Sequence, residues 1–310
     1  MQLTSKIINK FNYDKLAFNQ LLTEAPKKYK VYYIPKRGAG LRMIAQPTKE
    51  LKNLQRFVVS LLEPILPVHH KAMAYQLNKS IKDNAILHKD NCYVLKMDFQ
   101  NFFNKIKPDL FLAKIDSSKL MLESVDKSVL SKLLFWRPGT KRSITLILSV
   151  GAPSSPFISN FVMYDFDQNI DDWCSNLGVV YSRYADDITF STNTKDLLVL
   201  VPKMVKKMLS EHVPGLTVNE SKTIFTSKAH NRHVTGVTLT PEGKLSVGRE
   251  RKRMLFAKVH QYSLGVLSTE DINKVRGLVA FANYIEGDFI LRLRKKYGTE
   301  LIDNFMKEGS

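Results

Sequence analysis

The alternation of hydrophobic and polar residues changes period early in the chain. Residues 31–45 predict two strands joined by a turn that contains two glycines. Apolar residues then recur at helical spacing from 51 to 62, and this pattern ends at Pro64. We therefore expect a β-hairpin followed by an amphipathic helix.

Two strand patterns in the middle of the chain end in acidic residues. Residues 93–98 predict a buried strand whose last residue is Asp98, followed by a turn. Residues 179–191 predict a hairpin whose tight turn carries Asp186 and Asp187. If these strands are neighbours in one sheet, the three carboxylates converge at its end.

The other periodic segments are mainly helical. A helix is expected to begin at Ser154 and Ser155, with serine caps and Pro156 in its first turn, and to continue to Trp173. Further along the chain we expect an amphipathic helix over 197–209, a strand within 216–225, a hairpin over 234–247 that turns at 241–243, and polar helices from Gly248 onward.

Charge changes this picture of an ordinary mixed α/β protein. Lys and Arg number 47 against 29 Asp and Glu, a formal net charge of +18, and the first 52 residues alone hold 11 basic against 3 acidic side chains. Such an excess indicates a polyanionic partner, because each phosphate that is neutralised releases a counterion. On charge alone, a merely soluble basic surface is the alternative.

The cysteines and the hydropathy of the sequence exclude further classes of protein. Cys92 and Cys174 are far apart and lack metal-ligand spacing, so we expect neither a zinc site nor a disulfide framework. No run of about 20 apolar residues occurs, and the N-terminus lacks a leader pattern. The expectation is a cytoplasmic protein that does not associate with membranes.

The three acids predict a metal site. Carboxylates that converge from adjacent strands suit Mg²⁺, which prefers oxygen ligands and shares them readily with phosphates. Two such ions about 3.5–4 Å apart would activate a 3′ hydroxyl and stabilise a leaving pyrophosphate. The alternative for Asp186 and Asp187 is ordinary turn chemistry, since aspartate is common in turns.

The sequence around these acids resembles reverse transcriptases. Residues 184–187 (YADD), set between two strand patterns, resemble the signature of that family. Residues 96–103 (KMDFQNFF) look like its first palm motif, which implies that Asp98 binds metal and that Phe99 and Phe103 contact the nucleotide. The resemblance further implies that Phe103 blocks a ribose 2′-OH and so favours dNTPs.

Three further segments are similar to nucleotide-binding motifs of the family. Residues 151–156 resemble the loop under the incoming nucleotide, where Gly151 lets the backbone approach closely. Residues 219–223 resemble the motif whose lysine, here Lys222, approaches the pyrophosphate. Many relatives have Gln before the loop glycine, whereas this chain has Val150.

The N-terminal hairpin resembles the fingers of these enzymes. Its basic side chains Lys36, Arg37 and Arg42 then correspond to the residues that clamp the triphosphate. Arg suits this task because its planar fork binds two phosphate oxygens. Arg42 is the favoured contact, since it lies on the strand rather than in the turn.

Two short motifs narrow the resemblance to the reverse transcriptases of bacterial retrons. The segment from Asn84 to His88 (NAILH) fits their NAxxH motif, and Val234, Thr235 and Gly236 fit their VTG motif. The resemblance implies RNA-contact or scaffold positions for these residues. Taken alone, a histidine such as His88 is more often structural.

The C-terminal helices resemble a thumb that grips the template-primer duplex through its phosphates. A solvated charged face is the competing interpretation. The basic residues concerned are Arg249, Arg251, Lys252, Arg253, Lys258, Lys274, Arg276, Arg292, Arg294, Lys295 and Lys296.

Together these patterns predict an α/β (α+β) right-hand polymerase with fingers, an antiparallel palm sheet and a helical thumb. We expect fingers and palm over 1–247 and the thumb over 248–310. The resemblance implies an RNA-directed DNA polymerase that uses two Mg²⁺ or Mn²⁺ ions and dNTPs. It also implies a branched RNA-DNA hybrid (msDNA), made from a guanosine 2′-OH of a retron noncoding RNA that is both primer and template, and a role with an effector protein in phage defence.

Two alternatives remain at this stage. One is a reverse transcriptase of the group II intron or diversity-generating type; the length of 310 residues and the lack of a maturase or endonuclease extension argue against the intron type. The other is an RNA-binding scaffold with a retired polymerase site. Val150 favours the scaffold, whereas the intact set of Asp98, Asp186 and Asp187 opposes it.

Overall fold

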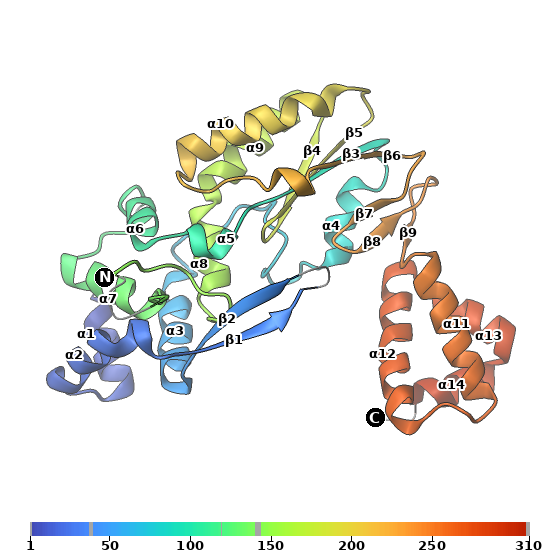
Figure 1. The fold of residues 1–310 in the computed structure, drawn as a ribbon, viewed down its shortest axis with the longest axis horizontal. Coiled ribbons are helices and arrows are strands. Elements are labelled where there is room, and N and C mark those ends of the chain that lie inside the picture. Colours follow the sequence, from blue (N-terminus) through green and yellow to red (C-terminus); the bar gives the residue numbers. More distant parts are fainter. Residues whose placement is uncertain (1, 37–39, 119, 140–143, 308–310) are drawn as a thin grey trace.

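The computed structural model of the protein describes residues 2–36, 40–118, 120–139 and 144–307. The N-terminal part packs helices beside a long hairpin (Figure 1). Its elements are α1 (Leu3–Phe11), α2 (Lys15–Glu24), η1 (Ala25–Lys27), β1 (Tyr29–Pro35), β2 (Leu41–Pro47) and α3 (Lys49–Leu62).

The central part contains a four-stranded sheet and the helices that surround it. Its helices are α4 (Ile81–His88), α5 (Phe102–Lys105), α6 (Pro108–Asp116), α7 (Ser124–Leu134), α8 (Ser155–Val162), α9 (Tyr164–Asn176), η2 (Leu197–Leu200), α10 (Val201–His212) and η3 (Glu220–Lys222). Its strands are β3 (Tyr93–Asp98), β4 (Val180–Tyr184), β5 (Asp187–Thr192) and β6 (Ile224–Ser227).

The C-terminal part joins a small sheet to a helical bundle, which stands apart from the N-terminal helices in Figure 1. The small sheet consists of β7 (Arg232–Val234), β8 (Val237–Leu239) and β9 (Leu245–Ser246). The bundle consists of α11 (Arg249–Ser263), α12 (Thr269–Glu286), α13 (Phe289–Tyr297) and α14 (Thr299–Lys307). None of the helices within the described ranges is both long enough and apolar enough to cross a membrane.

All strand pairs of the three sheets are antiparallel, as the sequence predicted for the palm. The central sheet has the order β4-β5-β3-β6, so β3 lies between two strands that follow it much later in the chain. The helix α9 packs against β4 and α10, whereas α4 contacts β4 and the whole small sheet. This places α4 at the junction between the palm sheet and the C-terminal part.

Two hydrophobic clusters form the core. The larger cluster joins the N-terminal helices to α6–α10 and the central sheet. The smaller cluster joins β7–β9 to α11–α14 and also takes in Ala85 of α4 and Val94 of β3. The small sheet and the four helices therefore share one core, which is anchored to the palm through α4.

The helix expected from Ser154 to Trp173 is divided into two. The helix α8 ends at Val162, Met163 follows with ψ near −3°, and α9 begins at Tyr164. Two aspartates in the first turn of α9 favour a new helix start at this point, because they complement the N-terminal end of the helix dipole.

The expected serine caps are also wrong. Ser154 precedes α8, but its side chain makes no capping hydrogen bond, and the buried hydroxyls of Ser154 and Ser155 have no partner among the described residues. Pro156 does lie in the first turn, where a missing N–H costs nothing.

The expected strand within 216–225 forms only at its end. Val218 makes a single bridge to Phe99, a short 3₁₀ helix follows, and β6 begins at Ile224. The amphipathic helix expected over 197–209 begins with the 3₁₀ turn η2, and the hairpin expected over 234–247 gains β7 as a third strand.

Candidate active site

The sheet brings the three acids together as predicted. Asp98 is the last residue of β3 and lies directly opposite Asp187, the first residue of β5. Asp186 precedes it in the turn, and its carbonyl accepts a hydrogen bond of 3.0 Å from the N–H of Phe99. Backbone pairing thus fixes the ends of both strands next to each other.

The turn that carries Asp186 has an unusual backbone. Its two central residues are Ala185 and Asp186, and Ala185 has a φ of 57°. Tight hairpin turns favour positive φ at this position and usually place glycine there. An alanine in this conformation costs roughly 1–3 kcal/mol, which the surrounding contacts must offset.

Arg183 supplies one of these contacts, and sequence reasoning missed it. Its fully buried guanidinium donates to the Ala185 carbonyl at 3.2 Å and to Asn160 Oδ1 at 3.0 Å. It also forms an ion pair with Asp167 of α9, at 2.6 Å between Nη2 and Oδ2. A charged residue within an apolar strand was the available signal, but its partner lies on another element.

Lys222 lies beside the acids. Its Nζ donates to Asp98 Oδ2 at 2.9 Å, and this hydrogen bond raises the pKa of Lys222. Burial and then the Asp98 charge raise the pKa of Asp186. Burial, followed by repulsion from Asp186 and Asp98, raises the pKa of Asp187 to about 6. Lys222, Arg42 and Lys96 lower these pKa values without cancelling the rise, so negative charge is locally in excess at this end of the sheet.

This excess suits a divalent cation, since all three acids offer the hard oxygens that Mg²⁺ prefers. Within the described ranges, however, the only three-residue group of His, Cys, Asp or Glu ligand atoms that all lie within 4.8 Å of one another is His69, His70 and Asp171. Asp98, Asp186 and Asp187 do not form such a group, as expected for like charges of which one is bound to a lysine.

The group around His69 is a poor cation site in comparison. The Lys71 ammonium lies 3.9 Å from the Asp171 carboxylate and already compensates its charge. The backbone N–H of Lys71 also donates to His69 Nδ1 at 3.3 Å, which places the proton of the neutral ring on the buried Nε2, so neither ring nitrogen offers a free lone pair.

Replacing Asp187 by Asn is expected to stabilise the protein in EDTA at about pH 8, by about 1 kcal/mol after solvent screening is allowed for. A carboxyl whose pKa is about 6 when folded and 3.8 in an unstructured peptide destabilises the fold as it ionises. The gain should therefore build up between about pH 4 and pH 6 and stay constant above, so that at pH 5 it is roughly half of its value at pH 8. Urea unfolding at both pH values measures it, and an equal gain at both would contradict the charge crowding.

A cavity of about 330 Å³ lies on the fingers side of the acids. Lys52 and Arg56 of α3 contribute basic groups to its wall, Tyr75 and Phe103 contribute rings, and Gly151 contributes backbone. The size is within the range of small-ligand sites. Sequence reasoning missed Lys52, Arg56 and Tyr75, although the four-residue spacing of the two basic side chains indicates one helix face.

The loop at Gly151 is held tightly against β2. Gly151 has a φ of 122°, and a Cβ at this position would lie 3.0 Å from Ile44 Cγ2 and 3.1 Å from the Ala45 carbonyl oxygen. The N–H of Ala45 donates to the Val150 carbonyl at 2.9 Å. The backbone of Val150, rather than its side chain, therefore joins the loop to the hairpin.

The predicted nucleotide contacts separate into two groups. Phe103 is partly buried in the cavity wall, and Lys36 and Arg42 are exposed on the hairpin. Arg42 is close enough to counteract the raised pKa of Asp186. Arg37 lies outside the described residues.

The predicted nucleotide contact by the Phe99 side chain is wrong. Phe99 is 1% exposed, because the alternation of β3 directs its ring into the core, where it stacks on Phe102 and meets Phe166 edge to face.

The two short motifs lie together, but mostly inside the protein. Asn84, His88 and Val234 are buried, so their side chains are inaccessible to RNA and fit the scaffold alternative better. Thr235 and Gly236 are more exposed. They line a cleft of about 410 Å³ together with three of the predicted site residues, namely Asp98, Asp187 and Lys222.

The bundle presents basic and aromatic side chains together. Arg249 and Arg253 are exposed, whereas Arg251 is partly covered and stacks on Phe281 at 5.6 Å. A groove of about 690 Å³ in the bundle is lined by Arg253, Phe256, Ala257, His260, Ser263, Lys296 and Tyr297.

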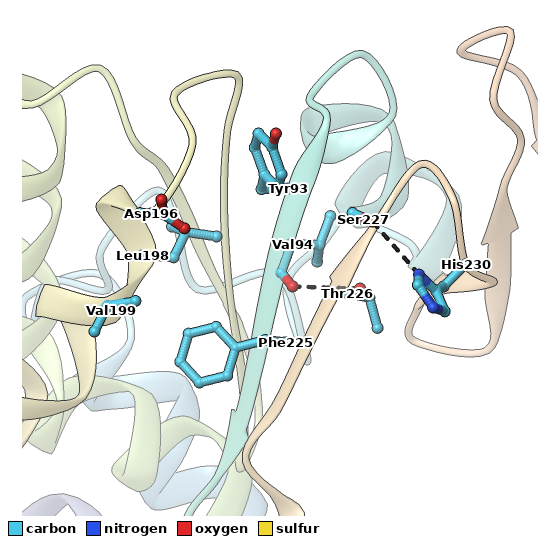
Figure 2. Close-up of a pocket in the computed structure, with 9 residues that line it drawn as sticks. All are labelled: Tyr93, Val94, Asp196, Leu198, Val199, Phe225, Thr226, Ser227 and His230. Atoms are coloured by element: carbon cyan, nitrogen blue, oxygen red, sulfur yellow. Dashed lines mark hydrogen bonds between the residues drawn. The ribbon is translucent and has the colours of Figure 1, made fainter.

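Another cleft, of about 410 Å³, lies beside β3, β6 and η2 (Figure 2). It is mainly apolar, and its exposed side chains include Val199 and Phe225, whose ring points from β6 toward η2. None of the predicted site residues lines it.

An antiparallel sheet that presents three convergent acids next to a basic hairpin defines a polymerase palm with its fingers. Residues 34–239 match the model of the family described as Reverse transcriptase (RNA-dependent DNA polymerase). The chain is therefore a reverse transcriptase, an RNA-directed DNA polymerase, and it shares the family's general dependence on divalent metal ions.

Similar proteins show to which group of reverse transcriptases the chain belongs. The chain is 47% identical over 292 residues to the Retron Ec83 reverse transcriptase of Escherichia coli, with 94% of each chain covered. It is 31% identical to the Retron Ec73 reverse transcriptase of the same species, covering 90% of this chain and 89% of that one. The chain belongs to the bacterial retron reverse transcriptases, as its short motifs predicted, and the intron-type and scaffold alternatives are set aside.

Among solved structures, telomerase from Candida albicans aligns with 93% of this chain at 12% identity and a TM-score of 0.48. The chain spans 59% of the length of that telomerase.

Proposed function

We propose that this enzyme copies a retron noncoding RNA into DNA and holds two Mg²⁺ ions on Asp98, Asp186 and Asp187. The observation that carries the proposal is the register of the palm sheet, in which Asp98 faces Asp187 and Asp186 occupies the adjoining turn. When bound, two divalent ions would activate the attacking hydroxyl and stabilise the leaving pyrophosphate. Mn²⁺ is the alternative ion, because it accepts the same oxygen ligands.

The chain's own residues position the substrates around this centre. Lys36 and Arg42 of the hairpin, with Lys52 and Arg56 in the cavity wall, bind the triphosphate of the incoming dNTP. Lys222, now paired with Asp98, stabilises charge on the pyrophosphate as it leaves. A lysine is protonated at neutral pH, and the raised pKa of Lys222 reinforces this.

The C-terminal helices bind the RNA-DNA duplex. Their groove combines Arg253 and Lys296 with Phe256 and Tyr297, a pairing of charge and rings that suits phosphates and sugars. We retain 1–247 as fingers and palm and 248–310 as thumb in this scheme. The same RNA would serve as primer and template, and the msDNA product would act with an effector protein in phage defence in the cytoplasm.

The product of expression in a host tests this function. The protein is expressed with the noncoding DNA upstream of its gene, and nucleic acid is examined for RNase-resistant single-stranded DNA that shifts after debranching. A debranching-sensitive product supports both reverse transcription and 2′-linked priming. DNA synthesis on an ordinary primed RNA, without a branched product, would overturn the priming, and no synthesis on either template would overturn the catalytic assignment.

Replacing Phe103 by Val is expected to relax sugar selection. The ring lies in the wall of the cavity beside Gly151, and its loss opens space for a 2′-OH. Loss of a steric contact of this kind is worth about 1–3 kcal/mol, so the ratio of kcat/KM for rNTP over dNTP should rise by about 10- to 200-fold. Single-nucleotide incorporation measures the ratio. The matched control, Phe103→Tyr, keeps the ring and should keep the selection.

A further inference from the structure

We propose that His88 is a positioning residue, which ties the catalytic hairpin to the Thr235 turn through a directed chain of hydrogen bonds. The inference rests on the proposed function, because the turn walls the cleft in which template and primer would meet the acids. His88 itself takes no part in the polymerase reaction. Its task is to hold α4 in register between two parts of the enzyme.

The imidazole of His88 bridges the two strands of the catalytic hairpin. Its Nε2 lies 2.8 Å from Ser182 Oγ on β4, and its Nδ1 lies 2.7 Å from Ser191 Oγ on β5. All three side chains are fully buried. Since buried hydrogen bonds are costly to leave unmade, α4 has one favoured position against the sheet.

The other partners of the two serines determine which atoms donate and which accept in this series of hydrogen bonds. Ser182 Oγ donates to Asn84 Oδ1 at 2.6 Å, so it accepts from His88 Nε2. Asn91 Nδ2 donates to Ser191 Oγ at 2.7 Å, which leaves the Ser191 hydrogen for His88 Nδ1. A neutral ring with its proton on Nε2 satisfies every one of these bonds.

The environment keeps the ring neutral. Burial, followed by the nearby charge of Lys71, lowers the pKa of His88 to about 3. A second proton on Nδ1 would face the hydroxyl hydrogen of Ser191 and break the direction of the chain. This series of hydrogen bonds therefore acts as a fixed scaffold rather than a pH switch.

The other end of the chain reaches the wall of the catalytic cleft. Asn84 Nδ2 lies 3.5 Å from Thr235 Oγ1, which itself donates to the Ile81 carbonyl at 3.2 Å. Thr235 and Gly236 have φ values of 47° and 81°, and a threonine with positive φ needs such support. Ile81, Thr235 and Gly236 line the cleft that also contains Asp98.

Apolar packing alone would not fix the position of α4 between the two parts of the enzyme, which explains the need for hydrogen bonds here. Ala85 of α4 belongs to the core of the C-terminal part, whereas Ser182 and Ser191 belong to the palm sheet. Apolar contacts alone allow small slides of one part over the other, but a slide would break several directed hydrogen bonds at once. The distance between the acids and the Thr235 turn is thereby fixed.

The experiment compares Thr235→Val and His88→Gln with Thr235→Ser on the full chain. Thr235→Val removes the hydroxyl while keeping the shape, and Thr235→Ser keeps the hydroxyl. His88→Gln retains a donor for Ser182 but loses the bond to Ser191. Thr238→Val, on the neighbouring strand but outside the cleft, is the matched control.

We expect Thr235→Val and His88→Gln to raise KM for a primed RNA template by about tenfold, the worth of one hydrogen bond of about 1.4 kcal/mol. The KM for dNTP should stay within about twofold, because the nucleotide cavity lies beside Gly151. Thr238→Val should behave as the unchanged enzyme, and Thr235→Ser, which keeps the hydroxyl, should regain most of the template affinity that Thr235→Val loses. An unchanged template KM in Thr235→Val, or an equal rise of both KM values, would overturn the inference.

A spectroscopic measurement separates this inference from the proposed function. In protein carrying ¹⁵N-histidine, the ring whose signals vanish in His88→Gln should be neutral, protonated at Nε2, and constant from about pH 5.5 to 8. A ring protonated at Nδ1, or one that titrates in this range, would overturn the chain of bonds even in an inactive enzyme. Failure of the unchanged enzyme to make DNA, with the expected tautomer present, would instead overturn the proposed function alone.

Discussion

Replacing Asp186 by Asn is expected to lower DNA synthesis by about a thousandfold, since losing a metal ligand at the reacting centre removes roughly 4 kcal/mol of transition-state stabilisation. The side chain sits in the turn between β4 and β5, where the amide fits without changing the backbone. Primer extension on an RNA template under single-turnover conditions measures the loss.

Binding of the primed template should survive in Asp186→Asn, because the basic hairpin and the C-terminal groove are unchanged. Fluorescence anisotropy without dNTP measures it. Asp172→Asn is the control, an acid on α9 whose side chain accepts hydrogen bonds from Gln168 one turn before it. DNA synthesis at the unchanged rate in Asp186→Asn would contradict the assignment of Asp186 to the metal site.

The second large effect is expected on stability. Replacing Asp167 by Ala leaves the fully buried guanidinium of Arg183 without its counter-charge, although Asn160 and the Ala185 carbonyl still accept from it. Breaking a buried pair in this way costs about 3–5 kcal/mol. For a chain of this size we expect Tm to fall by on the order of 10 °C, measured by circular dichroism.

Two comparisons make this prediction specific. Glu270→Ala breaks the exposed pair with Lys274 and should change stability by less than about 1 kcal/mol. The double change Asp167→Leu with Arg183→Met removes both charges and should be more stable than Asp167→Ala. If Asp167→Ala unfolds at the same temperature as Glu270→Ala, the buried pair does not support the turn at Ala185.

Local patterns were sufficient to predict the elements that carry the acids. The strand β3 has the predicted bounds of 93–98, and β5 extends the predicted hairpin by one residue to Thr192. Runs of strand formers that end in polar residues leave little freedom of assignment. The convergence of Asp98 with Asp187 followed from the expectation that these strands are neighbours.

Features that depend on distant partners were not predictable in the same way. In the sequence, Arg183 cannot be distinguished from a surface arginine. Only the fold places Asp167, on the preceding helix, next to it. His88 fitted an RNA contact as well as a scaffold, and only the two serines from β4 and β5 decide between them. Sequence alone also could not determine that Phe99 faces the core while Phe103 faces the cavity.

The position of β3 at the centre of the palm has a consequence for synthesis of the protein on the ribosome. Tyr93 pairs with Thr192 and with Ser227, and Val94 packs in a core whose other members mostly follow residue 234. Neither edge of β3 is covered until roughly a hundred further residues have been made. Because such long-range pairing is slow and exposes apolar surface, the nascent chain should need protection by a chaperone until its last helices emerge.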